Sequence, residues 1–452
     1  MAHSQKSIRD HARKRSHPNV DNEAISQQLE ELVKPCVYSQ LACYRSLGMR
    51  ARILGLPLML AAVLTLVWRQ VPSVRELNRM LARENLLWAK ATRGHSPASR
   101  RRRRSARTRC VSQQALSQRL LTFPADLFER VLTELLVTLN QRWSQREKRP
   151  LPKSVAYANQ HFEQLWIVDA STLEALFRKL KSLEGSNLGK LGGRICAVVD
   201  LKTRYPIQTW FNQRPYAHES NFIPNLLELV TPRTLLLLDR GFWNYSLFKQ
   251  LTQKRADFIT RLKTNAQYEL ISILSQSATH KDTLIRLGTG YQGNPILELR
   301  LVEIRHGRSW YRYLTSVLKP DVLPPYVVGD LYSRRWRIEE SFLLLKRLLG
   351  LSYLWTGSIN GIKLQLWATW LFYTVLLDLC DEIADELTLP FDSISVEMVF
   401  RGIYHFTQAA SQGNTISLIT YLTAPENQDL GIVKSPRPIR AQPPFNLSPN
   451  PA

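Results

Sequence analysis

Long apolar runs are few in this chain of 452 residues. Two stand out, Ile53–Trp68, which contains Pro57, and Leu366–Leu377. A membrane-spanning helix needs about 20 consecutive apolar residues, which neither run supplies. The basic N-terminus is not followed by an apolar segment with a small-residue cleavage site, so no secretion signal is expected. Both runs are therefore predicted to be buried helices, and no membrane partner is expected.

Cysteine is scarce as well. The chain has five cysteines, an odd number, and no two of them form a C-x-x-C pair. They are scattered along the sequence, at Cys36, Cys43, Cys110, Cys196 and Cys380. This pattern argues against a disulfide scaffold or a zinc finger and is typical of a protein in a reducing cytoplasm.

Acidic residues are outnumbered. The 37 Asp and Glu residues face 61 Lys and Arg residues, which gives a formal net charge of +24. This excess is more than solubility requires and indicates a polyanionic partner, either nucleic acid or an anionic membrane surface. The composition alone leaves both candidates open.

The first 150 residues are predicted to form a helical, basic, DNA-binding region. Ser73 and Glu76 make a capping box for a helix with an apolar face. A run of five consecutive arginines follows: Arg100, Arg101, Arg102, Arg103 and Arg104. Like charges at this density repel one another unless phosphates neutralise them, so the run is a candidate DNA contact.

A further helix is predicted to begin near Ser112. Its side chains include Gln113, Gln114 and Arg119, which are able to hydrogen-bond base edges in a major groove. The alternative is an amphipathic surface helix of a helical bundle. Sequence alone leaves both interpretations open.

From about residue 160 the pattern changes to short apolar strands that alternate with helices. We predict strands at Leu165–Val168, Arg194–Val199, Pro206–Trp210, Leu235–Leu238 and Phe258–Leu262, with helices near 219–229 and 245–255. This order predicts an α/β fold with a mixed sheet and helices on its faces. Residues 264–325 alternate in a β pattern, a long helix is expected from Gly329 through Leu349, and the Pro-rich tail 435–452 is predicted to be disordered.

Two aspartates close buried strands in this basic protein. Asp169 follows L-W-I-V, and Asp239 follows L-L-L-L. A carboxylate at such a place is costly without a cationic partner, and strands of one sheet can deliver their last side chains to one crevice. The alternatives are a turn or N-cap role for Asp169 and an ion pair with Arg240 for Asp239. Asp200 also ends a strand, but the sequence after it is that of a hairpin turn, so its role is predicted to be structural.

A third acid lies on the long predicted helix. At about 100° per residue, Tyr332, Arg335, Glu339 and Lys346 fall within a stripe roughly 60° wide, whereas Glu340 points about 100° away from Glu339. An ordinary ion pair explains Arg335 and Glu339 alone. It gives no reason for a phenol and a second cation to share the stripe, which makes Glu339 the candidate third carboxylate.

These residues resemble a known family. The Y-R-E-K spacing of two, three and six residues, with V-D-A-S-T around Asp169 and L-D-R-G-F around Asp239, is similar to that of bacterial insertion-sequence transposases of the "insertion sequence four" group, within the DDE class. The resemblance runs from about 160 to 405 and is loose over residues 1–150. It implies a ribonuclease-H-like catalytic domain in two parts, 160–263 and 326–390, with a β-rich insertion at 264–325 and a C-terminal helical region at 391–434 as a possible dimer contact.

The resemblance also implies a mechanism. Asp169, Asp239 and Glu339 would hold two divalent ions, Mg²⁺ with Mn²⁺ as the alternative, for phosphodiester cleavage and strand transfer. Arg335 and Lys346 would bind phosphates beside the scissile bond, and Tyr332 a terminal phosphate.

An aromatic residue of the insertion is a further candidate. Trp310 would stack on a base flipped out near the element end, although a core tryptophan is the alternative interpretation.

The implied partners are double-stranded DNA, both element ends and target, and a second copy of the chain in a DNA-bound homodimer. The implied location is the bacterial cytoplasm, at the nucleoid. Two other functions stay open: a catalytically inactive DNA-binding protein derived from an insertion element, and a structure-specific nuclease of the same fold.

Overall fold

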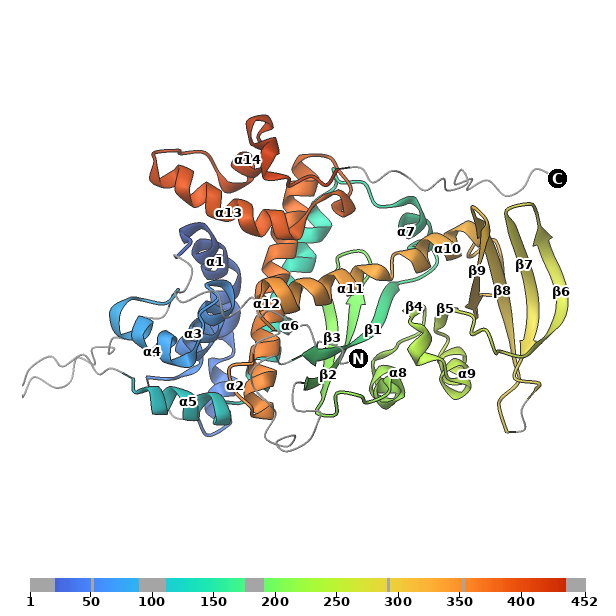
Figure 1. The fold of residues 1–452 in the computed structure, drawn as a ribbon, viewed down its shortest axis with the longest axis horizontal. Coiled ribbons are helices and arrows are strands. Elements are labelled where there is room, and N and C mark those ends of the chain that lie inside the picture. The colour runs from blue at the N-terminus through green and yellow to red at the C-terminus, as the bar shows by residue number, and fades with distance from the viewer. Residues whose placement is uncertain are drawn as a thin grey trace, which may run out of the picture.

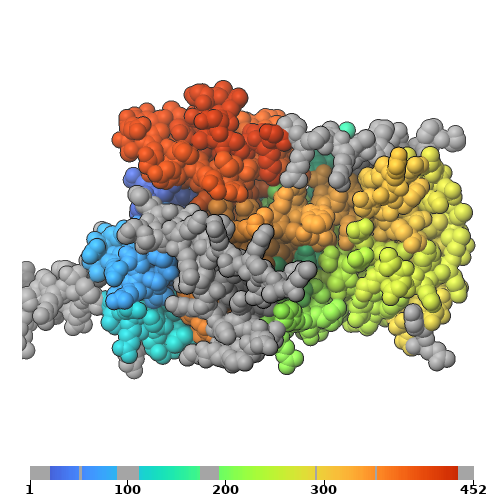
Figure 2. Space-filling model, viewed as in Figure 1, coloured from blue at the N-terminus to red at the C-terminus, as the bar shows by residue number. Residues whose placement is uncertain are grey.

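A computed structural model gives the fold of the chain and describes residues 21–49, 53–88, 111–174, 191–290, 293–351 and 354–435. The arginine run Arg100–Arg104 and the tail from 436 onward lie outside the described residues. Seen as in Figure 1, N-terminal helices occupy one end of the molecule and strands β6 to β9 the other. Figure 2 shows the C-terminal helices beside the N-terminal ones, on the same half of the molecule.

The described N-terminal part is helical. Its helices are α1 (Glu23–Ser39), α2 (Leu41–Ser46), α3 (Leu56–Trp68), α4 (Val74–Arg83), α5 (Gln113–Thr122), α6 (Asp126–Gln145) and α7 (Lys153–Ala158). The apolar run that begins at Ile53 forms α3, in which nearly every side chain is buried, as predicted. Ser73 caps α4 by accepting the Glu76 N–H at 3.2 Å. No helix among the described residues is long and apolar enough to cross a membrane.

A nine-stranded mixed sheet forms the centre of the rest, in the order β3-β2-β1-β4-β5-β9-β8-β7-β6. The strands are β1 (Gln164–Glu174), β2 (Leu191–Asp200), β3 (Pro206–Asn212), β4 (Thr234–Leu238), β5 (Asp257–Arg261), β6 (Tyr268–Gln276), β7 (His280–Leu287), β8 (Leu297–His306) and β9 (Ser309–Thr315). Strand β2 is antiparallel to both of its neighbours, β1 and β3, whereas β4 runs parallel to both β1 and β5. The predicted mixed α/β sheet is therefore confirmed.

The two faces of the sheet are covered by different helices. Leu165 and Ile167 of β1 face a core that includes the N- and C-terminal helices, whereas Trp166 and Val168 face a core built on the other side. That second core includes α8 (Ile223–Leu229) and α9 (Tyr245–Gln253). Because both faces of β4 are covered, its five residues are all buried, which explains the unbroken leucine run.

Strands β6 to β9 continue the main sheet. Strand β9 pairs antiparallel with β5, and β8, β7 and β6 follow outward from it (Figure 1). A fully buried ion pair joins β7 to β8, in which Arg300 contacts Asp282 at 2.6 and 2.7 Å. Arg300 also donates to the carbonyl of Leu323, just before α10 (Pro325–Ser333). This β region thus positions the start of the helical segment that carries the third acid.

The stretch predicted to be helical from Gly329 through Leu349 is helical over most of its length, but it is divided into three segments. Helix α10 ends at Ser333, α11 (Trp336–Leu343) follows after a break, and a π-helical segment spans Leu344–Leu348. At the break, the N–H of Arg335 bonds to the carbonyl of Tyr332 three residues back, at 3.1 Å. The chain is therefore wound more tightly at this junction than in an α-helix.

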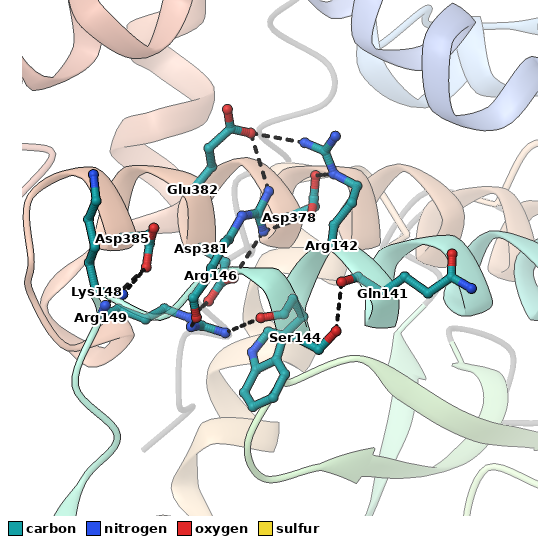
Figure 3. A network of polar contacts seen from close by, with 11 residues as sticks. Gln141, Arg142, Ser144, Arg146, Lys148, Arg149, Asp378, Asp381, Glu382 and Asp385 are labelled. Atoms are coloured by element: carbon teal, nitrogen blue, oxygen red, sulfur yellow. Dashed lines mark hydrogen bonds and ion pairs between the residues drawn. The ribbon is translucent and has the colours of Figure 1, made fainter.

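Helix α12 (Ile359–Glu386) is a long buried helix that contacts both the N-terminal helices and strand β3 of the sheet. It packs against α3 and α6 and is followed by α13 (Val396–Ser411) and α14 (Leu418–Thr423). Figure 3 shows an ion-pair network between the end of α6 and α12. Arg146 contacts Asp378 at 2.8 Å and Asp381 at 2.9 Å, and Arg142 also contacts Asp378, at 3.0 Å. These ion pairs therefore fix the end of the N-terminal helix α6 to α12.

Candidate active site

Asp169 and Asp239 lie side by side. Strands β1 and β4 are parallel neighbours with Val168 opposite Leu238, so the next residue of each strand is one of the two aspartates. An Asp169 oxygen accepts the Ala170 N–H at 2.7 Å, and an Asp239 oxygen accepts the Gly241 N–H at 3.1 Å. The structure thus brings together two acids that are 70 positions apart in the sequence.

Glu339 reaches the same place from α11. The link between the three carboxylates is the guanidinium of Arg335, which is 6% exposed. Its Nη1 lies 2.8 Å from Asp169 Oδ2, and its Nη2 lies 2.8 Å from Glu339 Oε1 and 3.4 Å from Asp239 Oδ1. One buried cation therefore contacts all three predicted carboxylates.

The electrostatics follow from this burial and crowding. Burial raises the pKa of the Asp169 carboxyl to about 7; the Arg335 guanidinium opposes this, and the charges of Asp239 and Glu339 add to it. Burial works against the charge of Arg335, but the carboxylates outweigh it and raise the pKa of the guanidinium. The cluster holds three carboxyl groups and one guanidinium, so it would stabilise a further positive charge.

The remaining signature residues lie around this cluster. Tyr332 is buried, and its ring centroid is 5.8 Å from the Arg335 Cζ atom. Burial raises the pKa of its phenol to about 12. Lys346 donates to the Ser171 hydroxyl at 2.6 Å, two residues beyond Asp169 on β1. All four signature residues therefore converge on the part of β1 around Asp169, although the helix that carries them is broken.

The donor set suits a hard divalent cation, because carboxylate oxygens are its preferred ligands. No three acidic, histidine or cysteine side chains among the described residues form a ready metal-binding group. The geometry explains this, since the carboxylates are aimed at the Arg335 guanidinium. The metal-holding role of the three acids stays a prediction.

The alternatives for the aspartates can be compared with these contacts. Asp239 caps a short 3-10 turn, Arg240–Phe242, but its ion pair is with Arg335 and not with Arg240. Asp200 is buried in the β2–β3 turn and accepts the N–H groups of Lys202 and Thr203, in agreement with the structural role predicted for it.

Sequence reasoning missed the support of the Asp239 loop. Glu219 forms an ion pair with Arg194 on β2, and its carboxylate lies against Gly241. A Cβ at Gly241 would lie 2.5 Å from the Glu219 carboxyl carbon, so a side chain there requires the Glu219 carboxylate to move. The glycine of L-D-R-G-F was a visible signal of a close approach, but nothing in the sequence indicated the partner.

A second missed residue is Trp336. It follows Arg335 directly, is 62% exposed, and has its ring 5.6 Å from the Arg335 Cζ atom. Trp310, which the sequence nominated, lies on β9 at 39% exposure with the Lys281 ammonium 5.5 Å from its ring, so it is not a core residue. Both indoles offer a face to solvent, but Trp336 is the one beside the carboxylates.

The predicted DNA-reading helix is α5. Gln113 and Gln114 are exposed on it. Arg119, however, donates to the Tyr44 hydroxyl at 3.0 Å and to the Leu54 carbonyl at 3.2 Å. These contacts favour a structural role for Arg119 in the N-terminal bundle, whereas base readout by the two glutamines stays a prediction.

Comparison with known proteins agrees with this site. Residues 160–375 match the family model described as the transposase DDE domain, a range that contains all three acids. This part of the chain is a transposase DDE domain, and the resemblance drawn from the sequence is confirmed.

Its relatives are insertion-sequence proteins. The transposase InsG for insertion sequence element IS4 of Escherichia coli is 28% identical over 35% of this chain and 37% of that protein. A putative transposase for element IS4SA of Synechocystis is 24% identical over 42% of this chain and 54% of that protein. The matches thus span about half or less of these relatives. A piggyBac transposase, in a synaptic complex with hairpin DNA, shares 14% identity over 61% of this chain and 58% of that one, with a TM-score of 0.33.

Proposed function

We propose that the protein is a DNA transposase that binds the ends of an insertion sequence, cleaves them by phosphodiester hydrolysis and joins their 3′-hydroxyls to target DNA. The observation that carries the proposal is the meeting of Asp169, Asp239 and Glu339 on one guanidinium, beside β1 and at the end of β4. A net charge of +24 suits the polyanionic substrate.

The three acids fit divalent ions. Mg²⁺, with Mn²⁺ as the alternative and two ions per site, would supply stabilisation of the attacking and leaving oxygens of the phosphodiester. Lys346 holds its ammonium beside β1, where it can pair with a phosphate. Trp336 offers an exposed aromatic face next to the acids, onto which a base of the end can stack.

The domain organisation is proposed on the same basis. Residues 160–263 and 326–390 would form a ribonuclease-H-like catalytic domain, 264–325 its insertion, and 1–150 the region that binds DNA. Residues 391–434 would contribute to a homodimer, because two DNA ends must be held together. The bacterial cytoplasm, at the nucleoid, is the location such a function requires.

The test is strand cleavage of a linear DNA that carries the element's own terminal repeats. Asp169→Asn, Asp239→Asn and Glu339→Gln should each abolish cleavage with Mg²⁺ while DNA binding survives. Glu340→Gln is the matched control, since Glu340 lies on the same helix but pairs with Arg337 at 2.9 Å. A variant of the first three that still cuts would reject the assignment.

The same assay distinguishes the other functions. A nuclease would cut without joining ends to a target, and an inactive DNA-binding protein would bind without cutting. Joined products from the wild type that disappear on adding a chelator are the expected result.

A further inference from the structure

The contacts of Arg335 suggest more than a phosphate clamp. Both oxygens of Asp169 are engaged, one by the Ala170 N–H and the other by Arg335. Asp239 is engaged in the same way, by the Gly241 N–H and by Arg335. A metal ion at either aspartate would compete with the guanidinium, because both cations bind the same carboxylate oxygens.

We propose, on the basis of the function proposed above, that Arg335 is an internal cation that gathers the three carboxylates before metal arrives. Binding of divalent metal then expels its guanidinium, which becomes available to a DNA phosphate. Arg335 is thus a positioning residue in the metal-free protein and a phosphate ligand in the loaded one.

The charges of the cluster favour such an exchange. Three carboxyl groups face the single positive charge of the guanidinium, and no other cation contacts them among the ion pairs of the described residues. A divalent ion supplies more charge in a smaller volume and takes oxygen ligands only. The displaced guanidinium is already flanked by the Trp336 ring on an exposed face, where a phosphate can meet it.

Reciprocity follows by thermodynamic linkage. If metal frees Arg335 for phosphate, then DNA that holds Arg335 must raise the affinity for metal by the same factor. Binding of metal and binding of the DNA end are therefore coupled through the Arg335 side chain.

The test measures binding and needs no turnover. Ca²⁺ affinity is measured by calorimetry without DNA for the wild type, Arg335→Ala and Arg335→Lys, with Arg401→Ala as a charge-matched control on an exposed pair with Glu397. Removing the internal competitor should raise Ca²⁺ affinity about tenfold in Arg335→Ala. Lysine keeps the charge but its compact ammonium lacks the planar fork that spans the three carboxylates, so Arg335→Lys should give an intermediate value, and Arg401→Ala should match the wild type. A melting curve of each variant shows that it is folded.

A second measurement uses a duplex with the terminal repeat. In Ca²⁺, Arg335→Ala should lose affinity for this duplex about tenfold, whereas with chelator the loss should vanish, because the acids then hold the guanidinium. Unchanged or weaker Ca²⁺ binding by Arg335→Ala, or the same DNA loss with and without Ca²⁺, would overturn the proposal. If Asp169→Asn and Asp239→Asn bind Ca²⁺ as the wild type does, the metal centre itself is refuted, which is a different failure.

Discussion

The buried ion pair of the β region gives a prediction with a calculable size. Asp282 and Arg300 are both 0% exposed, and their two contacts of 2.6 and 2.7 Å form a bidentate pair. Replacing Asp282 by leucine leaves a guanidinium buried without its counter-ion. Loss of one partner of such a pair costs about 3–5 kcal/mol. Asp282→Leu should therefore destabilise this part of the sheet by that amount.

The double variant Asp282→Leu with Arg300→Met separates the cost of the unpaired buried charge from the cost of the other hydrogen bonds that Arg300 makes. It removes both charges, and replacing a buried pair by apolar side chains is often neutral or favourable. Arg300 also donates to the carbonyl of Leu323 at 2.7 Å, and that acceptor would lose its partner. An unsatisfied buried acceptor costs about 1–3 kcal/mol. The double variant should thus be more stable than Asp282→Leu alone, yet less stable than the wild type.

The assay is hydrogen exchange of the amides of β7, β8 and β9, together with the melting temperature. The control is the exposed pair on the same two strands, Arg286 with Glu298 at 3.3 Å, whose side chains are 43% and 60% exposed. Glu298→Leu should cost less than about 1 kcal/mol. Wild-type protection in Asp282→Leu, or a double variant no better than that single one, would refute the reasoning.

Three further changes test the site. Trp336→Ala should weaken binding of a terminal-repeat duplex by about 1–3 kcal/mol, because an exposed stacking face is lost, while Trp336→Phe should retain most of the affinity in a fluorescence titration. Ca²⁺ affinity should fall about tenfold per pH unit below about 7, because the pKa of Asp169 is raised to about 7 and metal must displace the proton; calorimetry at pH 5.5 to 8 that shows a flat affinity would contradict this. Gly241→Ala places a methyl group against the Glu219 carboxylate, which should cost about 1–3 kcal/mol in a urea titration and lower cleavage, whereas wild-type behaviour would show that the loop gives way freely.

The sequence predicted the acids of the site because each directly follows a run of buried apolar residues, although in the structure only Asp239 follows the end of its strand, whereas β1 continues past Asp169 to Glu174. A carboxylate at that place is unusual whatever surrounds it, so Asp169 and Asp239 could be nominated without a structure. Their adjacency could not, because it depends on the register that sets Val168 opposite Leu238. Pairing between strands that are 70 positions apart leaves no local mark in either segment.

Helical geometry predicted the position of the third acid, Glu339, only in part. The stripe of Tyr332, Arg335, Glu339 and Lys346 assumed 100° per residue throughout, but the chain tightens before Arg335 and widens into a π-helical segment at Leu344–Leu348. A tight turn adds rotation per residue, and a wide turn removes it. The two departures act in opposite directions, so Lys346, which follows the first and lies within the second, still lies beside β1.

The N-terminal prediction for Arg119 depended on a polar side chain at a helical position. In the structure the Tyr44 hydroxyl and the Leu54 carbonyl accept from it, and both come from earlier helices or the loop between them. A sequence pattern reports which residues share a helix face. It does not report what lies opposite that face, so the sequence could not show that Arg119 contacts the N-terminal bundle.

The attachment of the N-terminal helices to α12 bears on how DNA would meet the acids. Asp378 is 1% exposed and pairs with Arg142 and Arg146, so neither the carboxylate nor the end of α6 can move without exposing an unpaired charge (Figure 3). Ionic contacts of this kind contribute little net stability but restrict the relative orientation of the helices that they join. DNA held by α5 would consequently lie at a fixed distance from Asp169 on β1. Recognition of the repeat and cleavage beside it would then be set by one rigid spacing, and flexibility would be needed only at the side chains of the site, of which Arg335 is the first that must move.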